Sequence, residues 1–274
     1  MSCKYTLIAL ALVAMLGGSI RATTAAELSQ GSPRLGSSMP ATNLFNHQGP
    51  EEQQSDQPDR FSVEQVWVRN VSGVMLAGTL FKVPHADQAV VLAHSFVLGQ
   101  NQTGLLPLAE ELARNGMTAL AFDFQGRGLT GGSPRYAEVH TDVEAIIGYL
   151  RDLGYDNIAS LGVGLGGFGS AKNGPALNGL ITISIPPVVN NRLGLDESDL
   201  SSPYPKLFIS AEYDYANGRP FAQYAMDLYD IAMEPKQLKI YSGNFHSMEL
   251  FHSSHAADLN NLIIEFFGDL SGQK

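Results

Sequence analysis

One glycine-rich stretch of the sequence, Leu161-Gly162-Val163-Gly164-Leu165-Gly166-Gly167, decides the fold. It follows the apolar run 158–163, which has the length and β-branched content of a buried strand, and the residues after it favour a helix. Small residues at such a junction allow the helix to pack closely on the strand. The stretch therefore predicts a tight strand-to-helix turn.

Two functional motifs fit this turn. Gly162, Gly164 and Gly167 match G-x-G-x-x-G, the fingerprint of a dinucleotide-binding loop. Gly162 and Gly166 also frame the G-x-S-x-G elbow that carries a nucleophilic serine, with Gly164 in the serine's place. A dinucleotide loop should follow the first strand of its unit, with an acid ending the next strand. Here several strands precede the loop and 180–185 ends without an acid, so the elbow is favoured.

Strand and helix patterns alternate on both sides of the turn. Residues 61–68 and 74–83 flank the turn 70–73 and predict a β-hairpin. Short apolar runs predict further strands at 89–93, 118–122, 158–163, 180–185, 207–210 and 238–241. Apolar residues at helical spacing predict helices around 105–112, 143–150, 221–232 and 259–267. A hairpin followed by strand–helix units implies a mostly parallel sheet covered on both faces.

An ordered set of motifs over about residues 61–270 resembles the α/β-hydrolase family, whose members include serine esterases and lipases. Ala93-His94-Ser95-Phe96 is similar to the family's strand-end His-Gly loop, with Ser95 in place of the glycine. The segment 123–128 is similar to its Asp-x-x-Gly-x-Gly loop. Glu212-Tyr213-Asp214 and Asn244-Phe245-His246 follow late strands, where the family keeps its acid and its histidine. The chain order elbow, Asp, His is that of the family.

The resemblance implies an α/β-hydrolase fold: a mostly parallel sheet of the eight-stranded type, helices on both faces and, because 186–203 is short, a minimal lid. It also implies the residues of an active site. The catalytic positions are Asp214, His246 and Gly164, the last at the nucleophile position. The oxyanion hole is expected from backbone N–H groups at Ser95 or Phe96 and at Leu165.

Gly164 has no hydroxyl at the position where the elbow motif carries its serine, and this bears on whether the protein hydrolyses esters. In a working triad, serine attacks the acyl carbon, histidine takes its proton and aspartate orients the histidine. Glycine suits the strained turn but removes the nucleophile, so Gly164 predicts an ester or acyl hydrolase of weak or no activity. His246 would act on water, or on a substitute hydroxyl at Ser95, Ser133 or Ser170. The alternative is a non-catalytic protein that binds a small molecule or a protein partner through the same pocket.

Composition excludes several other classes. The chain has 17 basic and 27 acidic side chains, a net charge of −10, so it lacks the basic surface that nucleic acid would need. One cysteine excludes a disulfide framework. His246, Glu249, His252 and His255 lie close in sequence, but their spacing matches no compact zinc motif. We therefore expect no metal and no cofactor. The resemblance to the α/β-hydrolase family implies an acyl or ester small molecule as the ligand.

The N-terminal residues have the pattern of a processing segment. Lys4 precedes the apolar run 7–16, and Thr24-Ala25-Ala26 offers small residues for cleavage. We predict a secretory signal peptide over 1–26, a flexible polar linker over 27–60 and the hydrolase-like domain over 61–274. Cleavage would leave 15 basic against 27 acidic side chains and no cysteine. The expected location is secreted or periplasmic, without stable membrane insertion after processing.

Overall fold

The structure is a computed structural model of the chain. The residues that it describes are 61–97, 99–185, 188–189, 193–216 and 219–271. The chain divides into two units, Met1–Gln54 and Ser55–Lys274. The first unit lies outside the described residues, as do the predicted signal peptide and linker. The description below therefore concerns the second unit.

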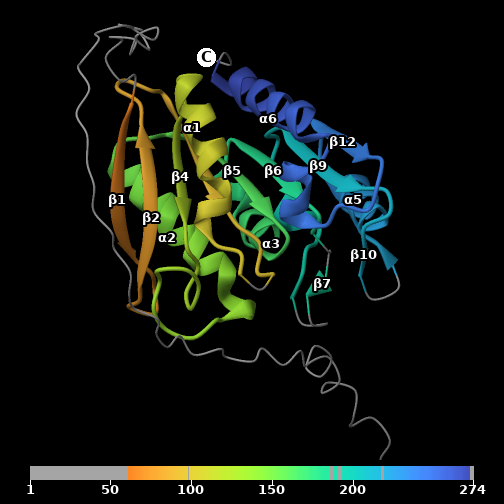
Figure 1. Cartoon of the computed structure of the whole chain (residues 1–274), viewed down its shortest axis with the longest axis horizontal. Helices are drawn as coiled ribbons and strands as arrows, with labels where there is room; N and C mark the ends of the chain where they lie inside the picture. The colour runs from red at the N-terminus through yellow and green to blue at the C-terminus, as the bar shows by residue number, and fades with distance from the viewer. Residues whose placement is uncertain (1–60, 98, 186–187, 190–192, 217–218, 272–274) are drawn as a thin grey trace, which may run out of the picture. The chain divides into compact units, whose positions relative to one another are not determined.

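The second unit contains a sheet of eight strands in the order β1-β2-β4-β3-β5-β6-β9-β12 (Figure 1). These strands are β1 Ser62–Arg69, β2 Met75–Lys82, β3 Gln88–Ala93, β4 Thr118–Phe122, β5 Asn157–Val163, β6 Gly179–Ile183, β9 Lys206–Ala211 and β12 Lys236–Tyr241. β1 and β2 form the predicted antiparallel hairpin, with Val66 opposite Gly78, and β2 pairs antiparallel with β4. All pairs from β4 to β12 are parallel.

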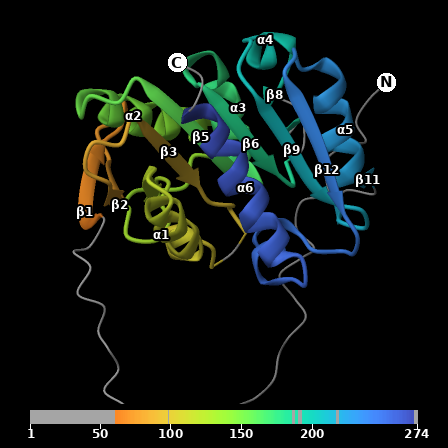
Figure 2. The same cartoon turned by 90° about the horizontal axis from the view of Figure 1, so that it is seen from above.

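Helices cover both faces of the sheet, and an apolar cluster lies between the helices and the sheet on each face (Figure 2). The helices are α1 Leu106–Arg114, α2 Val139–Asp152, α3 Leu165–Lys172, α4 Glu197–Leu200, α5 Phe221–Ile231 and α6 Ala256–Ser271. One cluster joins apolar side chains of α1 and α6 to the sheet, and the other joins those of α2, α3 and α5. The central strands β3, β4 and β6 are buried along their whole length. Burial on both faces explains why these strands read as continuous apolar runs.

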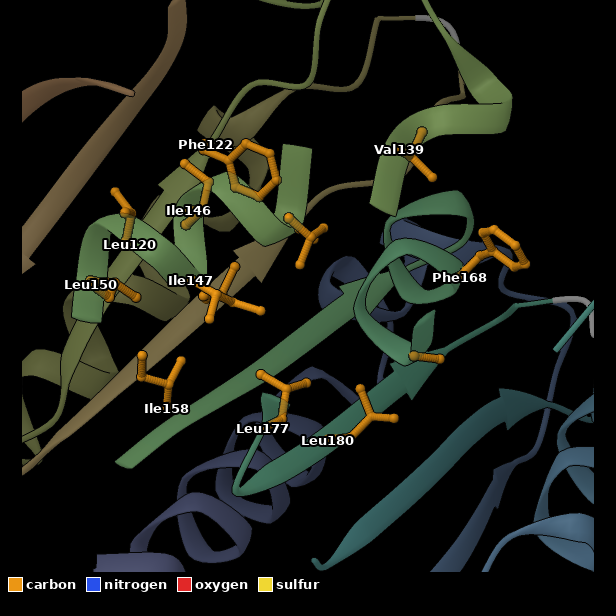
Figure 3. Packing of buried hydrophobic residues seen from close by; sticks show 14 of the residues in the cluster. Leu120, Phe122, Val139, Ile146, Ile147, Leu150, Ile158, Phe168, Leu177 and Leu180 are labelled. Carbon is orange, nitrogen blue, oxygen red and sulfur yellow. The ribbon is translucent and has the colours of Figure 1, made fainter. Parts of the chain in front are cut away.

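Figure 3 shows the second of these clusters in detail. Ile146 and Leu150 of α2 lie beside Leu120 and Phe122 of β4, all fully buried. Residues four apart on a helix share one face, so α2 presents its apolar stripe to the sheet. No helix in the described residues has the length and apolar character needed to cross a membrane.

The prediction of a mostly parallel eight-stranded sheet with helices on both faces is confirmed. The expected strands and helices agree with the observed ones to within about four residues at each end. The expected minimal lid, 186–203, contains a two-stranded hairpin of β7 Val188–Val189 with β8 Leu193–Gly194, followed by α4. A second small hairpin pairs β10 Tyr215–Ala216 with β11 Arg219–Pro220, just before α5.

Close packing at the start of α3 explains the glycines of the strand-to-helix turn. A Cβ on Gly162 would lie 2.5 Å from the backbone of both Gly166 and Gly167. A Cβ on Gly166 would overlap the carbonyl groups of Ala93 and His94, at the end of β3. Any larger residue would therefore push α3 away from β5 and β3.

Gly162→Ala should therefore destabilise the domain, whereas Gly148→Ala should not. Gly148 lies within α2 and a Cβ there meets nothing within 4 Å, so alanine should raise the free energy of unfolding by about 0.5–1 kcal/mol. Alanine at Gly162 should lower it by roughly 1–3 kcal/mol or more, through overpacking. Urea unfolding of both variants beside the unchanged protein measures the difference. Equal stability of the two variants would contradict the close packing seen at the turn.

Candidate active site

The predicted site residues all lie beyond the carboxyl ends of parallel strands. His94 and Ser95 follow β3, Gly164 follows β5, Asp214 follows β9 and His246 follows β12. Because parallel strands end at the same edge of a sheet, the topology directs these five residues to one edge. This is the edge at which open α/β sheets bind ligands.

Asp214 and His246 form a hydrogen-bonded pair. Nδ1 of His246 lies 2.8 and 3.0 Å from the two carboxylate oxygens of Asp214. Asp214 is 2% exposed, whereas the side chain of His246 is 37% exposed. The bond to Asp214 occupies Nδ1, so Nε2 is the ring nitrogen left to accept a proton. The exposed part of the ring gives a ligand access to it from solvent.

Backbone hydrogen bonds fix the two loops that carry this pair. The Glu212 N–H donates to the carbonyl of Tyr241, and the Tyr213 N–H donates to that of Gly243, both at 2.8 Å. Farther along, Glu249 and His246 exchange hydrogen bonds: the His246 N–H donates to Oε2 of Glu249 at 2.8 Å, and the Glu249 N–H donates to the His246 carbonyl at 3.0 Å. The ring of Phe221 packs at 5.0 Å from the His246 ring. Position and orientation of the histidine are therefore set before any ligand arrives.

The hydrogen bond from Asp214 raises the pKa of His246 above its ordinary value of 6.5, against the lowering effect of burial. A buried carboxylate stabilises the imidazolium that forms when the ring accepts a proton. Burial lowers the pKa of His94, the other histidine of this edge, so His94 stays neutral. The pair at Asp214 and His246 therefore suits a general base, whereas His94 does not.

Gly164 has the backbone conformation of a strained turn. Its φ is +55° and its ψ is −122°, which is outside both the right-handed and the left-handed helical regions. Its N–H donates to the carbonyl of Ile183 at 2.8 Å, which ties the turn to the end of β6. Leu165 is the first residue of α3, so its own N–H has no partner within the helix and remains available to an oxyanion.

Two serines surround the space in which a side chain of residue 164 would lie. A Cβ built on Gly164 would be 2.8 Å from Oγ of Ser95 and 3.5 Å from Oγ of Ser247. Ser247 directly follows His246, so its proximity also places the histidine loop against the turn. The structure thus brings Ser95, Gly164 and the loop of His246 together.

Two residues of this edge were not singled out from the sequence. Ser184 and Ser247 have φ values of +51° and +58°, although neither is glycine. The Ser247 N–H donates to Oγ of Ser184 at 3.2 Å. Such conformations cost roughly 1 kcal/mol or more per residue and gather at functional sites. No sequence pattern marks them, because serine is ordinary in loops and its strain arises from tertiary contacts.

The neighbouring loop from β3 is held by a buried histidine. Nδ1 of His94 lies 2.6 Å from the carbonyl oxygen of Ser95, which must accept, so Nδ1 carries the proton. Nε2 then accepts the Phe124 N–H at 3.5 Å. Phe96, the next residue of the loop, packs its ring against Phe124 at 4.9 Å. The loop expected to supply an oxyanion donor at Ser95 or Phe96 is therefore rigidly placed beside the turn.

Other sequence candidates lie elsewhere or are otherwise engaged. Ser133 is exposed in the loop before α2, and the Ser170 hydroxyl is buried against that of Ser160 at 2.8 Å. His255 bonds through Nε2 to the Ser242 carbonyl at 2.9 Å. Over the described ranges, no group of three or more His, Cys, Asp or Glu side chains is placed to hold a metal ion.

Comparison with known proteins identifies the fold. Neither a protein-family model nor a curated protein sequence matches the chain. An esterase from Pyrococcus furiosus superposes on it with a TM-score of 0.65 and 15% identity, over 77% of this chain and 94% of the esterase. The chain has an α/β-hydrolase fold. A dienelactone hydrolase from Anabaena variabilis gives a TM-score of 0.62 at 19% identity, over 77% and 98%. The esterase domain of a Rhodothermus marinus protein gives 0.58 at 20%, over 74% and 97%.

The Asp214–His246 bond predicts a measurable pKa difference. In the unchanged protein the pKa of the His246 ring should exceed 6.5, and Asp214→Asn should lower it because a neutral amide cannot stabilise the imidazolium. A raised pKa keeps the ring protonated at mildly acidic pH, so any activity that needs it as a base should rise with pH and level off above that pKa. NMR titration of the ring protons measures both proteins, with His94 as an internal reference. An unchanged His246 pKa in Asp214→Asn would show that the pair does not interact in solution.

Proposed function

We propose that this protein is an exported hydrolase of carboxylic esters with slow turnover, in which His246 is the general base and Asp214 orients it. The observation that carries the proposal is the bond from Nδ1 of His246 to the buried carboxylate of Asp214, 2.8 Å long, beside a turn of elbow geometry at Gly164. The esterase-like fold supports an ester as ligand. It does not by itself define the reaction.

The reaction would proceed through the proton acceptor on His246. Nε2 takes a proton from a hydroxyl group as its oxygen bonds to the ester carbon, and the negative charge moves to the carbonyl oxygen. The Leu165 N–H at the start of α3 would stabilise that charge, and the N–H of Ser95 or Phe96 is the expected second donor. When the intermediate collapses, the alkoxide leaves and takes the proton from the imidazolium. Asp214 stays ionised throughout and stabilises the charged ring.

Slow turnover follows from the missing side chain at residue 164. A serine on the elbow is tethered in the line of attack, and removal of a triad member leaves a rate of about 10³–10⁴ over the reaction in water. A hydroxyl that is not carried by the elbow is less favourably positioned. The same feature, Gly164, favours a second candidate: a protein that binds an ester or acyl ligand and releases it unchanged.

Activated short-chain esters separate the two candidates. The unchanged protein should hydrolyse p-nitrophenyl acetate faster than buffer, and His246→Ala should reduce kcat/KM by about 100-fold or more, the scale of general-base catalysis. His252→Ala is the matched control, because His252 is an exposed histidine that lies six residues farther along the chain. Its activity should equal that of the unchanged protein.

Two results would favour the binding protein instead. One is equal hydrolysis by the unchanged protein and His246→Ala, which would make the observed rate independent of the pair. The other is no hydrolysis at all, combined with saturable binding of a non-hydrolysable ester analogue such as a trifluoromethyl ketone, measured by calorimetry.

The export part of the proposal has its own test. The signal-peptide pattern supports cleavage after Ala26, which would make Glu27 the first residue of the mature protein. Expression of the whole chain in a bacterium should give a periplasmic or secreted product whose intact mass lacks residues 1–26. Recovery of the uncleaved chain in the cytoplasm would contradict export.

A further inference from the structure

We infer that the nucleophilic hydroxyl has moved from the elbow to the neighbouring loop, and that Ser95 supplies it. The inference rests on the proposed ester hydrolysis and names the group that His246 deprotonates. It starts from an exchange of two residues. Ser95 stands where related sequences are expected to have glycine, and Gly164 stands where they are expected to have serine.

The geometry shows that these two positions compete for one space. The Cβ of any side chain on residue 164 would be 2.8 Å from Oγ of Ser95 and 3.3 Å from its Cβ. Real Cβ atoms essentially never come within 3.0 Å of another heavy atom, so the neighbouring side chain would have to move. A hydroxyl on Ser95 is therefore compatible with Gly164, and it fills the space beside the position from which an elbow serine attacks.

The surroundings of Ser95 suit a nucleophile. Its side chain is almost completely buried, and its Oγ accepts the Val97 N–H at 3.3 Å. An N–H that donates to the oxygen stabilises the charge that develops when the proton leaves. The neutral His94 ring fixes the carbonyl of Ser95 at 2.6 Å, so the residue is held in place from the backbone side.

A second, unpaired hydroxyl faces the same space. Oγ of Ser247 is completely buried and finds no hydrogen-bond partner in the part of the chain that the structure describes. It lies 3.5 Å from the Cβ position of Gly164, on the residue that follows His246. Buried polar atoms are rarely left unpaired, so the site offers this donor to a polar atom that a substrate would bring, such as an ester oxygen.

The reaction balances without a further reactant except water. Oγ of Ser95 bonds to the ester carbon while its proton passes to Nε2 of His246. The bond from the ester carbon to the alcohol oxygen then breaks, and the alcohol leaves with that proton. Water then attacks the acyl-serine: its oxygen bonds to the acyl carbon while one of its protons passes to Nε2 of His246. The bond from the acyl carbon to Oγ of Ser95 breaks, Oγ takes that proton back from His246, and the carboxylic acid leaves.

Kinetics of matched serine variants give the first test. With p-nitrophenyl acetate, Ser95→Ala should lower kcat/KM at least about 100-fold, close to the loss in His246→Ala. Ser62→Ala is the control, because Ser62 is an exposed serine at the far hairpin strand β1, and its activity should be unchanged. Loss of activity in His246→Ala but not in Ser95→Ala would overturn this inference and keep the proposed hydrolysis. An inactive unchanged protein would overturn both.

Covalent labelling gives a second test that needs no variant at Ser95 to fold. A fluorophosphonate reacts with an activated serine: the P–O bond forms, the P–F bond breaks, fluoride leaves and His246 takes the proton. Trypsin releases the peptide 83–114, in which Ser95 is the sole serine. The elbow is released as a separate peptide, 152–172. We expect the label on 83–114 in the unchanged protein and its loss in His246→Ala. A label on another peptide, for example the one with Ser247, would overturn the assignment.

Variants that exchange the residues at positions 95 and 164 test whether the two side chains compete for the same space. Gly164→Ser alone should gain little, because the new Cβ meets the Ser95 hydroxyl. Ser95→Gly should be inactive for lack of a nucleophile, and the double variant Ser95→Gly/Gly164→Ser should exceed both single variants by about tenfold or more in kcat/KM. Additive effects of the two substitutions would show that the positions are independent and would overturn the inference.

Discussion

The turn at Gly164 is the constraint on which the rest of the site depends. A φ of +55° lets the chain leave β5 and begin α3 without an intervening loop. The close contact of Gly162 with Gly166 then holds the helix on the strand. Because α3 begins at the sheet edge, its first N–H groups point to the place where the other strand-end loops converge. The same turn leaves the first N–H groups of α3 without a partner inside the helix, and its close packing excludes side chains at Gly162 and Gly166.

The parallel sheet supplies the second half of the arrangement. Asp214 follows β9 and His246 follows β12, 32 positions later in the chain. Because the two strands are neighbours in the sheet, Nδ1 of His246 lies 2.8 Å from the carboxylate of Asp214. The loops that carry them are joined by backbone hydrogen bonds. Positive φ values at Ser184 and Ser247 indicate that the surrounding structure imposes these loop conformations.

Fold and chemistry separate clearly in this protein. Solved esterases share its fold at 20% identity or less, which establishes the architecture and no reaction. The hydrogen-bonded pair of His246 and Asp214, for which we propose the roles of base and orienting acid, is present, whereas Gly164 carries no hydroxyl. In the exchange that we infer between Ser95 and Gly164, the hydroxyl stays within the same small volume although it comes from another strand end. The position of the space beside Gly164 and Ser95 depends on how β3, β5 and α3 pack together, so no single sequence motif defines it.

The sequence by itself determined the succession of strands and helices along the chain, because burial on both faces of a sheet leaves continuous apolar runs. The prediction of a mostly parallel sheet is confirmed, whereas the spatial order of its strands came from the structure. It also indicated Gly164, Asp214 and His246 in family order, and the structure brings the last two together. Only the tertiary structure decided that Ser95 lies beside the absent side chain of residue 164, and that Ser184 and Ser247 are strained. Sequence patterns report local periodicity and turn preference. Distances between residues on different loops depend on how neighbouring strands pair and how closely a helix packs on them.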